Sequence, residues 1–589
     1  GTAQGGSGRS GGYGIGSNGT LTIAGGEIQQ TTGGNATGTF GTGGDGIRSG
    51  DMLTISGGEI KQATGGEATG STGTGGHGIY SSFVNILGGI ITRAKGGNAT
   101  DTNSGDGGTG IASDGALTIH SGNIGTAQGG TSANGTGGSG IRSGDTFTIS
   151  DNAAITNATG GTSTNGTGGS GIHGDGSSDD FKLYIYSATI ENATGGSGKW
   201  GGSGILGKTM EILTSTIKKA IGGRSTGEES YHTGGVGIAG SESLTIKGGT
   251  TVQAVGGDAD SGTGGSGIRS GSDIRSGSDS RSDSRSGSDS RSGSLSISGG
   301  TISATGGSGK SGGAGIDSSG TVSISDGKIE QAAGGRATGE DGTGGSGIRS
   351  NGTLTIKGGE IQQTAGGDAT GKGGTGGSGI HSGSVVKIWG GTITKATGGS
   401  GKSGGDGIGS YGALTISGSA KIGTAQGGAS ANGNGGSGIS SGGILTIEGS
   451  ANIGTAQGGA STNGTGGSGK SGGAGVSTES GIVSIGNSDT PLDLTATAPD
   501  ADNAIRGRDG KKLDEIIHLK ENGKRGLVKL VENGVTRLFH NGVYTASLPG
   551  FSGSETHPLG DWVITKKPTC TEKGERQRSC KVEHCVVTE

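Results

Sequence analysis

The chain has 589 residues, of which 152 are glycine, 26% are hydrophobic and 3% are aromatic, so it cannot bury a wide globular core. Its formal net charge of -5 includes no basic block, which argues against nucleic-acid binding, and no apolar run approaches the roughly 20 residues that a membrane-spanning helix needs. Composition alone would indicate a disordered chain. The regular spacing of isoleucine indicates a repeating fold instead.

The same phrase recurs fifteen times: a Gly-Ile step, about six residues, an apolar-x-Ile triad, a break that is usually Gly-Gly, and another Ile. The steps between units are 28 to 37 residues, with one of 48, which is the range of repeat architectures. Counted from the Ile or Val of the Gly-Ile step, the units begin at residues 15, 47, 79, 111, 141, 172, 205, 238, 268, 316, 348, 380, 408, 439 and 476.

The unit GIRSNGTLTIKGGEIQQTAGG shows how one coil is built. Leu354 and Ile356 flank Thr355, so the period of two points both apolar side chains to one side, as in a half-buried strand. Gly-Gly then predicts a sharp corner before the next inward Ile. We predict an all-β fold, a parallel β-solenoid of about 15 coils and about 65 to 70 Å. Its core ladder includes Leu53, Ile55, Ile60, Ile348, Leu354, Ile356 and Ile361.

Glycine also recurs with a period of three, for example at 398, 401, 404 and 407. Period three is typical of polyproline-II-type helices, in which glycine allows close lateral packing. We therefore expect a Gly-rich wall of stacked extended segments, resembling polyglycine II. The alternative is that these segments are loose surface loops.

The predicted solenoid domain spans residues 1–490, with a Ser/Asp/Arg insertion at 270–294. The first phrase copies the middle of later units, so we expect the chain to be part of a longer secreted protein. A cation site in the insertion would use Asp273, Asp279, Asp283 and Asp289, but interleaved arginines neutralise these carboxylates, and we expect a solvated loop.

Residues 491–550 read as a β-rich segment with Asn-Gly turns, which we expect to close or extend one end of the solenoid. Residues 551–589 form a small Cys-containing module. Three cysteines confined to the last twenty residues favour an extracellular or cell-surface location. Either one disulfide joins Cys570 to Cys580 or Cys585, or His557 and the three cysteines bind zinc.

The terminal module resembles a small repeat found on secreted proteins of Gram-positive anaerobes. The resemblance rests on His557, on Trp562 and on the run PTCTEKG at 568–574. Such repeats close with Cys-x-x-Cys-Gly, whereas four residues separate Cys580 from Cys585 and no Gly follows. That departure argues against a tight metal-binding knuckle.

Some polysaccharide-cleaving enzymes are also parallel β-helices, so acid and base candidates were sought. They would need two groups converging from adjacent coils. The candidates vary between units, and Ser is the most common residue directly before the Gly-Ile step, where Asp45 and His77 stand. We therefore expect loop or surface roles for these residues and no enzyme activity. The candidates are Asp45, His77, His173, Asp175, Asp179 and Asp180. No cofactor is indicated.

Units such as NGTLTIKGG with GGSGI resemble secreted bacterial β-helix proteins of carbohydrate-binding or adhesin-like type, over residues 1 to about 490. That resemblance implies a surface or matrix role and contact with polysaccharide. Trp200, Trp389 and Trp562 are the tryptophans that could stack on sugar rings.

We therefore predict an extracellular structural protein, a rigid stalk, fibre subunit or adhesin shaft that associates head to tail with itself. The alternative is a polysaccharide-binding surface module. An ice-binding protein is less favoured, because the outward residue of the triad is Thr in only eight of fifteen units. A polysaccharide-cleaving enzyme is less favoured again.

Overall fold

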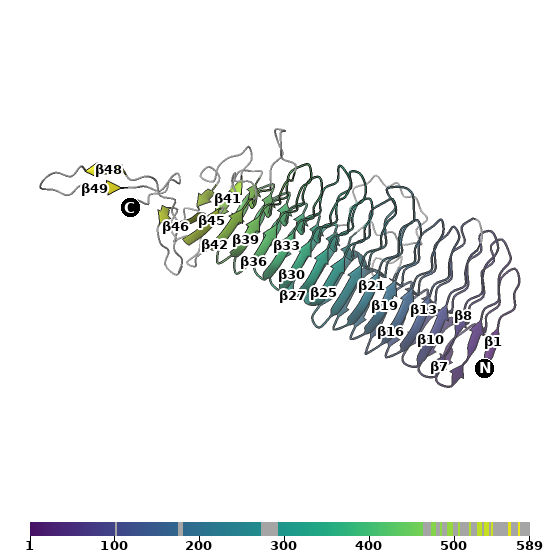
Figure 1. The fold of residues 1–589 in the computed structure, drawn as a ribbon. Helices are drawn as coiled ribbons and strands as arrows, with labels where there is room; N and C mark the ends of the chain where they lie inside the picture. The colour runs from purple at the N-terminus through teal and green to yellow at the C-terminus, as the bar shows by residue number, and fades with distance from the viewer. Residues whose placement is uncertain are drawn as a thin grey trace.

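The structure, a computed structural model, describes residues 1–100, 103–174, 181–271, 293–462, 473–478, 483–485 and 492–498, together with seven short strands after residue 500. These residues form no helix; nearly all their strands join one sheet that winds around a long axis. Figure 1 shows the strands stacked side by side from the N-terminal end, with non-strand arches along one side of the rod. The protein is an all-β parallel solenoid.

The first ladder contains the Gly-Ile strand of each coil, and every one of the fifteen predicted starts pairs in parallel with the next. Its members, some of which run on into the second ladder, are β2 (Ile15–Ser17), β6 (Ile47–Ile55), β9 (Ile79–Ile86), β11 (Ile111–Ser113), β14 (Ile141–Ser143), β17 (Ile172–Gly174), β20 (Ile205–Leu213), β22 (Ile238–Lys247), β24 (Ile268–Ser270), β26 (Ile316–Ser318), β28 (Ile348–Ser350), β31 (Ile380–Ser382), β34 (Ile408–Ser410), β37 (Ile439–Ser441), β40 (Val476–Thr478) and β43 (Ile505–Arg506).

The second ladder contains the apolar-x-Ile triads. It is formed by the later parts of β6, β9, β20 and β22 and by β3 (Leu21–Ile23), β12 (Leu117–His120), β15 (Phe147–Ser150), β18 (Lys182–Tyr186), β25 (Ser294–Thr305), β27 (Thr321–Ala333), β29 (Leu354–Ile356), β32 (Val386–Ile388), β35 (Leu414–Ile416), β38 (Leu445–Ile447), β41 (Val483–Ile485) and β44 (Ile517–Leu519). The corner that follows is built on glycine, as at Gly359 and Gly391, whose φ angles of 80° and 77° disfavour other residues.

The third ladder follows that corner. It is formed by the ends of β25 and β27 and by β1 (Thr2–Gln4), β4 (Glu27–Ile28), β5 (Gln30–Thr32), β7 (Glu59–Ile60), β8 (Ala63–Thr64), β10 (Ile90–Lys95), β13 (Asn123–Gln128), β16 (Ala154–Thr159), β19 (Thr189–Thr194), β21 (Thr216–Ile221), β23 (Thr251–Val255), β30 (Glu360–Ala365), β33 (Thr392–Thr397), β36 (Lys421–Gln426), β39 (Asn452–Gln457), β42 (Leu492–Thr497) and β45 (Leu527–Glu532).

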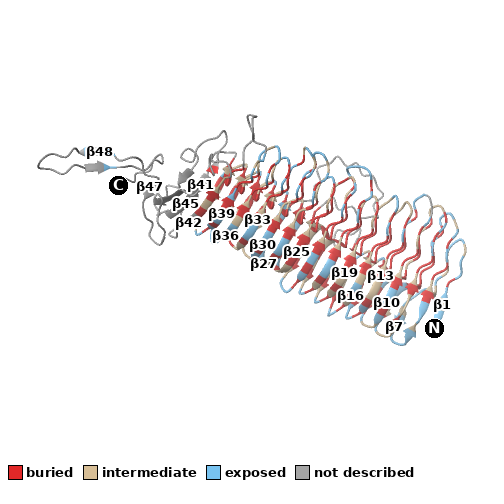
Figure 2. Ribbon diagram, in the orientation of Figure 1, coloured by how far each residue is buried: buried red, intermediate tan, exposed pale blue. Residues whose placement is uncertain are grey.

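One continuous core lies between the three ladders and extends from Ile47 to Ile505. The residues named above for the core ladder (Leu53, Ile55, Ile60, Ile348, Leu354, Ile356 and Ile361) are all no more than 1% exposed. Figure 2 shows the same buried positions repeating along the rod. A further core column, not predicted from the sequence, lies three residues after the third-ladder Ile. It is filled mostly by Ala, for example Ala332 and Ala396, and by Thr at Thr364.

Glycine pairs form the side of each coil away from this core. Gly366-Gly367 leaves the third ladder, and Gly376-Gly377 returns toward the first. The second glycines of these pairs bond across the coil and between coils: Gly367 N–H donates to Gly345 O at 2.7 Å, and Gly377 N–H donates to Gly367 O at 2.9 Å. A Cβ on Gly367 would lie 1.9 Å from Gly335 O, so no side chain fits. The two glycine segments therefore contact each other directly through their backbones, and their likeness to polyglycine II stays a prediction.

The parallel pairing continues into the segment predicted to follow residue 490, since β42, β43, β44 and β45 each pair with a strand of the preceding coil. After β45 the pairing becomes antiparallel, to β46 (Val535–His540) and then β47 (Val543–Thr545). A separate two-stranded sheet joins β48 (Val563–Lys566) to β49 (Glu575–Gln577). Within the described part of the chain, no helix is long and apolar enough to cross a membrane.

Candidate binding groove

The residue after the Ile of each first strand belongs to a row that faces away from the core. The Ile points into the core, so strand alternation turns the following side chain outward. Parallel register sets Arg142 beside His173, and Asp317 between Arg269 and Arg349. The row carries one side chain per coil, in the order Arg48, Tyr80, Ala112, Arg142, His173, Leu206, Ala239, Arg269, Asp317, Arg349 and His381.

Hollows lie along this row, lined on their other side by the returning Thr-Gly-Gly segments. One hollow of about 70 Å³ surrounds Arg142. A second of about 70 Å³ extends from Trp200 to Asp317, and a third of about 560 Å³ reaches His381 and Tyr411. Glycine and small residues before several of the Gly-Ile steps, such as Ser139 and Ser266, leave this space open. We call the three hollows and the row beside them the axial groove.

Two side chains at the first end of the groove cap the backbone of the next coil. Asp45 Oδ1 accepts the N–H of His77 at 2.7 Å, and His77 Nδ1 accepts the N–H of Thr109 at 2.9 Å. Burial lowers the pKa of His77 below its ordinary value. A neutral ring with a free Nδ1 lone pair is the form that this hydrogen bond requires.

Arg48 is enclosed by acidic and aromatic partners. Its Nη1 donates to Asp45 Oδ2 at 2.9 Å, and its guanidinium lies 4.5 Å from the ring centre of Tyr80 and 4.8 Å from that of Tyr13. The Tyr80 hydroxyl donates to Asp114, and burial raises the pKa of Tyr80 to about 12. These charged and aromatic groups satisfy one another at this end of the row.

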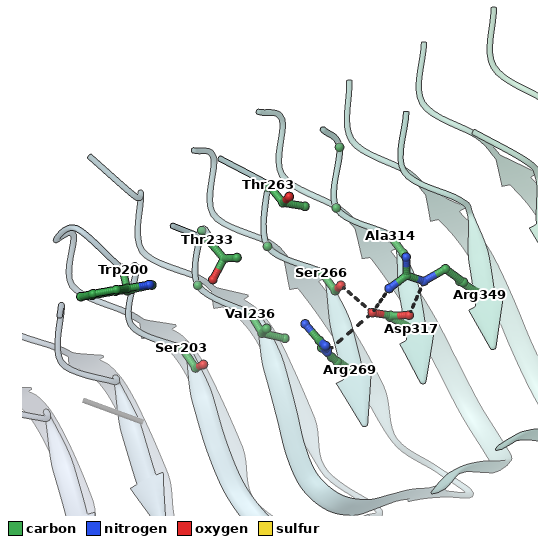
Figure 3. A pocket seen from close by; sticks show the side chains of 17 residues that line it. Trp200, Ser203, Thr233, Val236, Thr263, Ser266, Arg269, Ala314, Asp317 and Arg349 are labelled. Atoms are coloured by element: carbon green, nitrogen blue, oxygen red, sulfur yellow. Dashed lines mark hydrogen bonds and ion pairs between the residues drawn. The ribbon is translucent and has the colours of Figure 1, made fainter. Parts of the chain in front are cut away.

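The middle of the groove holds a buried carboxylate between two arginines, shown in Figure 3. Asp317 is 3% exposed at its side chain; Arg349 Nε donates to its Oδ1 at 2.8 Å, and Arg269 Nε lies 3.6 Å from its Oδ2. The Ser266 hydroxyl is 3.4 Å from Oδ2. The negative charge of Asp317 raises the pKa of Arg349. This network links three consecutive coils.

Aromatic rings stand beside the groove at two places. Trp200 takes the place that Thr167 occupies one coil earlier, and its ring centre is 4.6 Å from that of His232. Farther along, His381 and Tyr411 meet edge to face at 4.7 Å. Burial, followed by the charge of Arg349, lowers the pKa of His381. Flat aromatic faces in a polar groove are suited to stacking on sugar rings or other planar groups.

Two of the catalytic candidates are buried: Asp45, in a loop, and His173, in β17. Asp45 and His173 are 2% and 5% exposed, and so they are not surface residues. Both side chains lie against the glycine segments of neighbouring coils. Asp45 accepts a backbone N–H there, and His173 Nδ1 lies 3.4 Å from the Ser139 hydroxyl. His77 is partly buried. Several residues named in the sequence analysis lie outside the described residues: Asp175, Asp179, Asp180, Asp273, Asp279, Asp283, Asp289, His557, Trp562, Cys570, Cys580 and Cys585.

The groove residues Arg142, Arg269, Asp317, Arg349 and His381 were not identified from the sequence. All five stand directly after a Gly-Ile step. Charged and aromatic residues recur at this position in some units, whereas most other units have a small residue there, and this pattern could have identified the row. Among the described residues, no three His, Cys, Asp or Glu side chains gather as a metal site would require.

No family model, curated protein or solved structure matches this chain. The fold and the groove therefore define its class by themselves: a parallel β-solenoid with a polar groove along its axis.

Proposed function

We propose that this protein is an extracellular, non-enzymatic structural protein that acts as a rigid rod, in the role of a stalk, fibre subunit or adhesin shaft. The observation that supports this most directly is the unbroken core from Ile47 to Ile505, to which every coil contributes. Each coil is also bonded to the next through three ladders and through both glycine segments. A solenoid bonded on all sides resists bending, because bending must stretch one set of hydrogen bonds.

Electron microscopy of the purified chain tests this proposal. Fifteen coils spaced at ~4.8 Å predict straight single rods of about 7 nm, plus whatever the terminal module adds. Long filaments with uniform width would add head-to-tail self-association to the rod role. Bent or globular particles at neutral pH would contradict the rod itself.

Polysaccharide binding along the axial groove is the second candidate function. The observation that favours it is the set of cationic and aromatic side chains, such as Arg142 in the row and Trp200 in a returning segment, beside hollows that each span several coils. Elongated sites with a few polar and aromatic groups are suited to linear polymers. This role is tested by measuring how soluble polysaccharides bind to the immobilised protein. The control is the same protein with its axial groove blocked.

A further inference from the structure

We propose that the hollow around Arg142 is an anion subsite of the axial groove, which takes a carboxylate or sulfate group carried by a linear polysaccharide. This inference rests on the binding role proposed for the groove and is independent of the rod role.

The first argument is that Arg142 lacks the partner that the other arginines of the row have. Arg48 is paired with Asp45, and both Arg269 and Arg349 lie against Asp317. Arg142 forms no ion pair with any described residue, and its buried Nε has no hydrogen-bond partner. A buried guanidinium N–H without an acceptor is costly, and an anionic ligand would satisfy it.

The second argument is the chemistry around this guanidinium. Thr136, Ser139, Ser170 and His173 line the same hollow, so hydroxyl and ring groups surround the place where a bound anion would lie. The one carboxylate in the lining, Asp106, accepts the N–H of Thr136 at 2.6 Å. The carboxylate is thus engaged by the backbone and forms no ion pair with Arg142.

The third argument is size. The hollow of about 70 Å³ has room for a few water-sized groups, so it can hold a carboxylate or a sulfate but not a sugar ring. The rest of the ligand must therefore lie outside the hollow. A pendant acidic group on a larger molecule fits this shape.

The fourth argument is what lies next to the hollow along the axis. Trp200 stands two coils beyond Arg142, which is about 10 Å at ~4.8 Å per coil. Trp200 lines the next hollow along the axis. A linear polymer lying along the groove can place an acidic group at Arg142 while one of its rings lies beside Trp200.

The test uses the full chain and three polymers that share one backbone: dextran, carboxymethyl dextran and dextran sulfate. Binding is measured by calorimetry at low salt for the wild-type chain, for Arg142→Gln, and for Arg336→Gln, which removes an exposed arginine away from the groove. Rod length by electron microscopy confirms that both variants fold.

We expect the wild-type chain to bind an acidic polymer at least roughly tenfold more tightly than dextran, since hydrogen bonds to charged groups contribute about that much. Arg142→Gln should lose this preference and Arg336→Gln should keep it. The stronger of the two acidic polymers identifies the anion as carboxylate or sulfate.

Three results would overturn the inference in different ways. If Arg142→Gln binds the acidic polymers as the wild-type chain does, the subsite is wrong while groove binding stands. If the wild-type chain binds none of the three polymers, the binding role of the groove fails as well. If free acetate or sulfate competes as well as the matching polymer at equal charge concentration, the site takes a simple anion and the polysaccharide assignment is wrong.

Discussion

Arg349 Nε donates a hydrogen bond of 2.8 Å to Oδ1 of Asp317, although the two residues are one full coil apart in the chain. Parallel register makes them direct neighbours in the first ladder. Side-chain contacts between adjacent coils therefore stabilise the stack, and four predictions concern the stability of the stacked coils.

Asp317→Asn should destabilise the middle of the solenoid. The substitution keeps the shape but removes the charge between Arg269 and Arg349, and breaking a buried ion pair costs about 3 kcal/mol. Hydrogen exchange should show faster amide exchange in coils 268–380, because stability in repeat proteins is local. The matched control is Asp326→Asn, an exposed carboxylate nearby, which should leave exchange unchanged. Equal protection in both variants would show that the ion network does not stabilise these coils.

Gly367→Ala should disrupt the contact between the glycine segments. The added Cβ would lie 1.9 Å from Gly335 O, a backbone atom that cannot move without displacing the preceding coil. We expect a loss of roughly 3 kcal/mol, at the upper end of ordinary overpacking. Gly248→Ala is the control, since its Cβ meets no atom within 4 Å. Denaturant midpoints that fall equally for both variants would contradict the close-contact explanation.

Thr364→Val should stabilise the chain. Thr364 is fully buried in the Ala column between Ala332 and Ala396, and its hydroxyl has no hydrogen-bond partner in the part of the chain that the structure describes. Valine has the same shape without the polar group, so we expect a gain of about 1 kcal/mol. The outward-facing Thr355→Val should change little. A thermal midpoint that falls in Thr364→Val would show that the hydroxyl is satisfied in solution.

Stability should fall as the pH is lowered from neutral. Burial lowers the pKa of His77 below 6.5, so at acid pH the unfolded chain takes up a proton that the folded chain does not. The stabilisation is complete above about pH 6.5 and is lost as the pH falls toward the folded pKa, by at most about 1.4 kcal/mol per pH unit for one group. His381 should contribute in the same direction, because burial lowers its pKa too.

His77→Asn separates this effect from other acid effects. The asparagine carbonyl oxygen can accept the N–H of the next coil, as Asp45 Oδ1 does one coil earlier, but it does not titrate. The variant should therefore be less sensitive to pH between 7.5 and 5.5 in denaturant titrations. An unchanged pH slope would show that His77 is not the group responsible.

The repeating phrase was sufficient to predict the three ladders and the inward residues such as Leu354 and Ile356, because strand alternation is a local property of the backbone. The same phrase did not reveal the Ala column at Thr364, since Ala and Thr there look like ordinary strand residues. Nor did it reveal that Asp45 is buried. Burial at that position depends on the neighbouring coil, which approaches closely only because its glycines lack side chains.

The axial groove depended entirely on how the coils stack. Asp317 and Arg349 are separated by 32 positions and Arg269 and Asp317 by 48, yet both pairs are adjacent in one row. The coils differ in length, yet the first-ladder residues of successive coils stay paired. A local pattern therefore specifies which way a side chain points. Its partners, and the lack of an ion-pair partner for Arg142 among the described residues, are decided by the stacking of one coil on another.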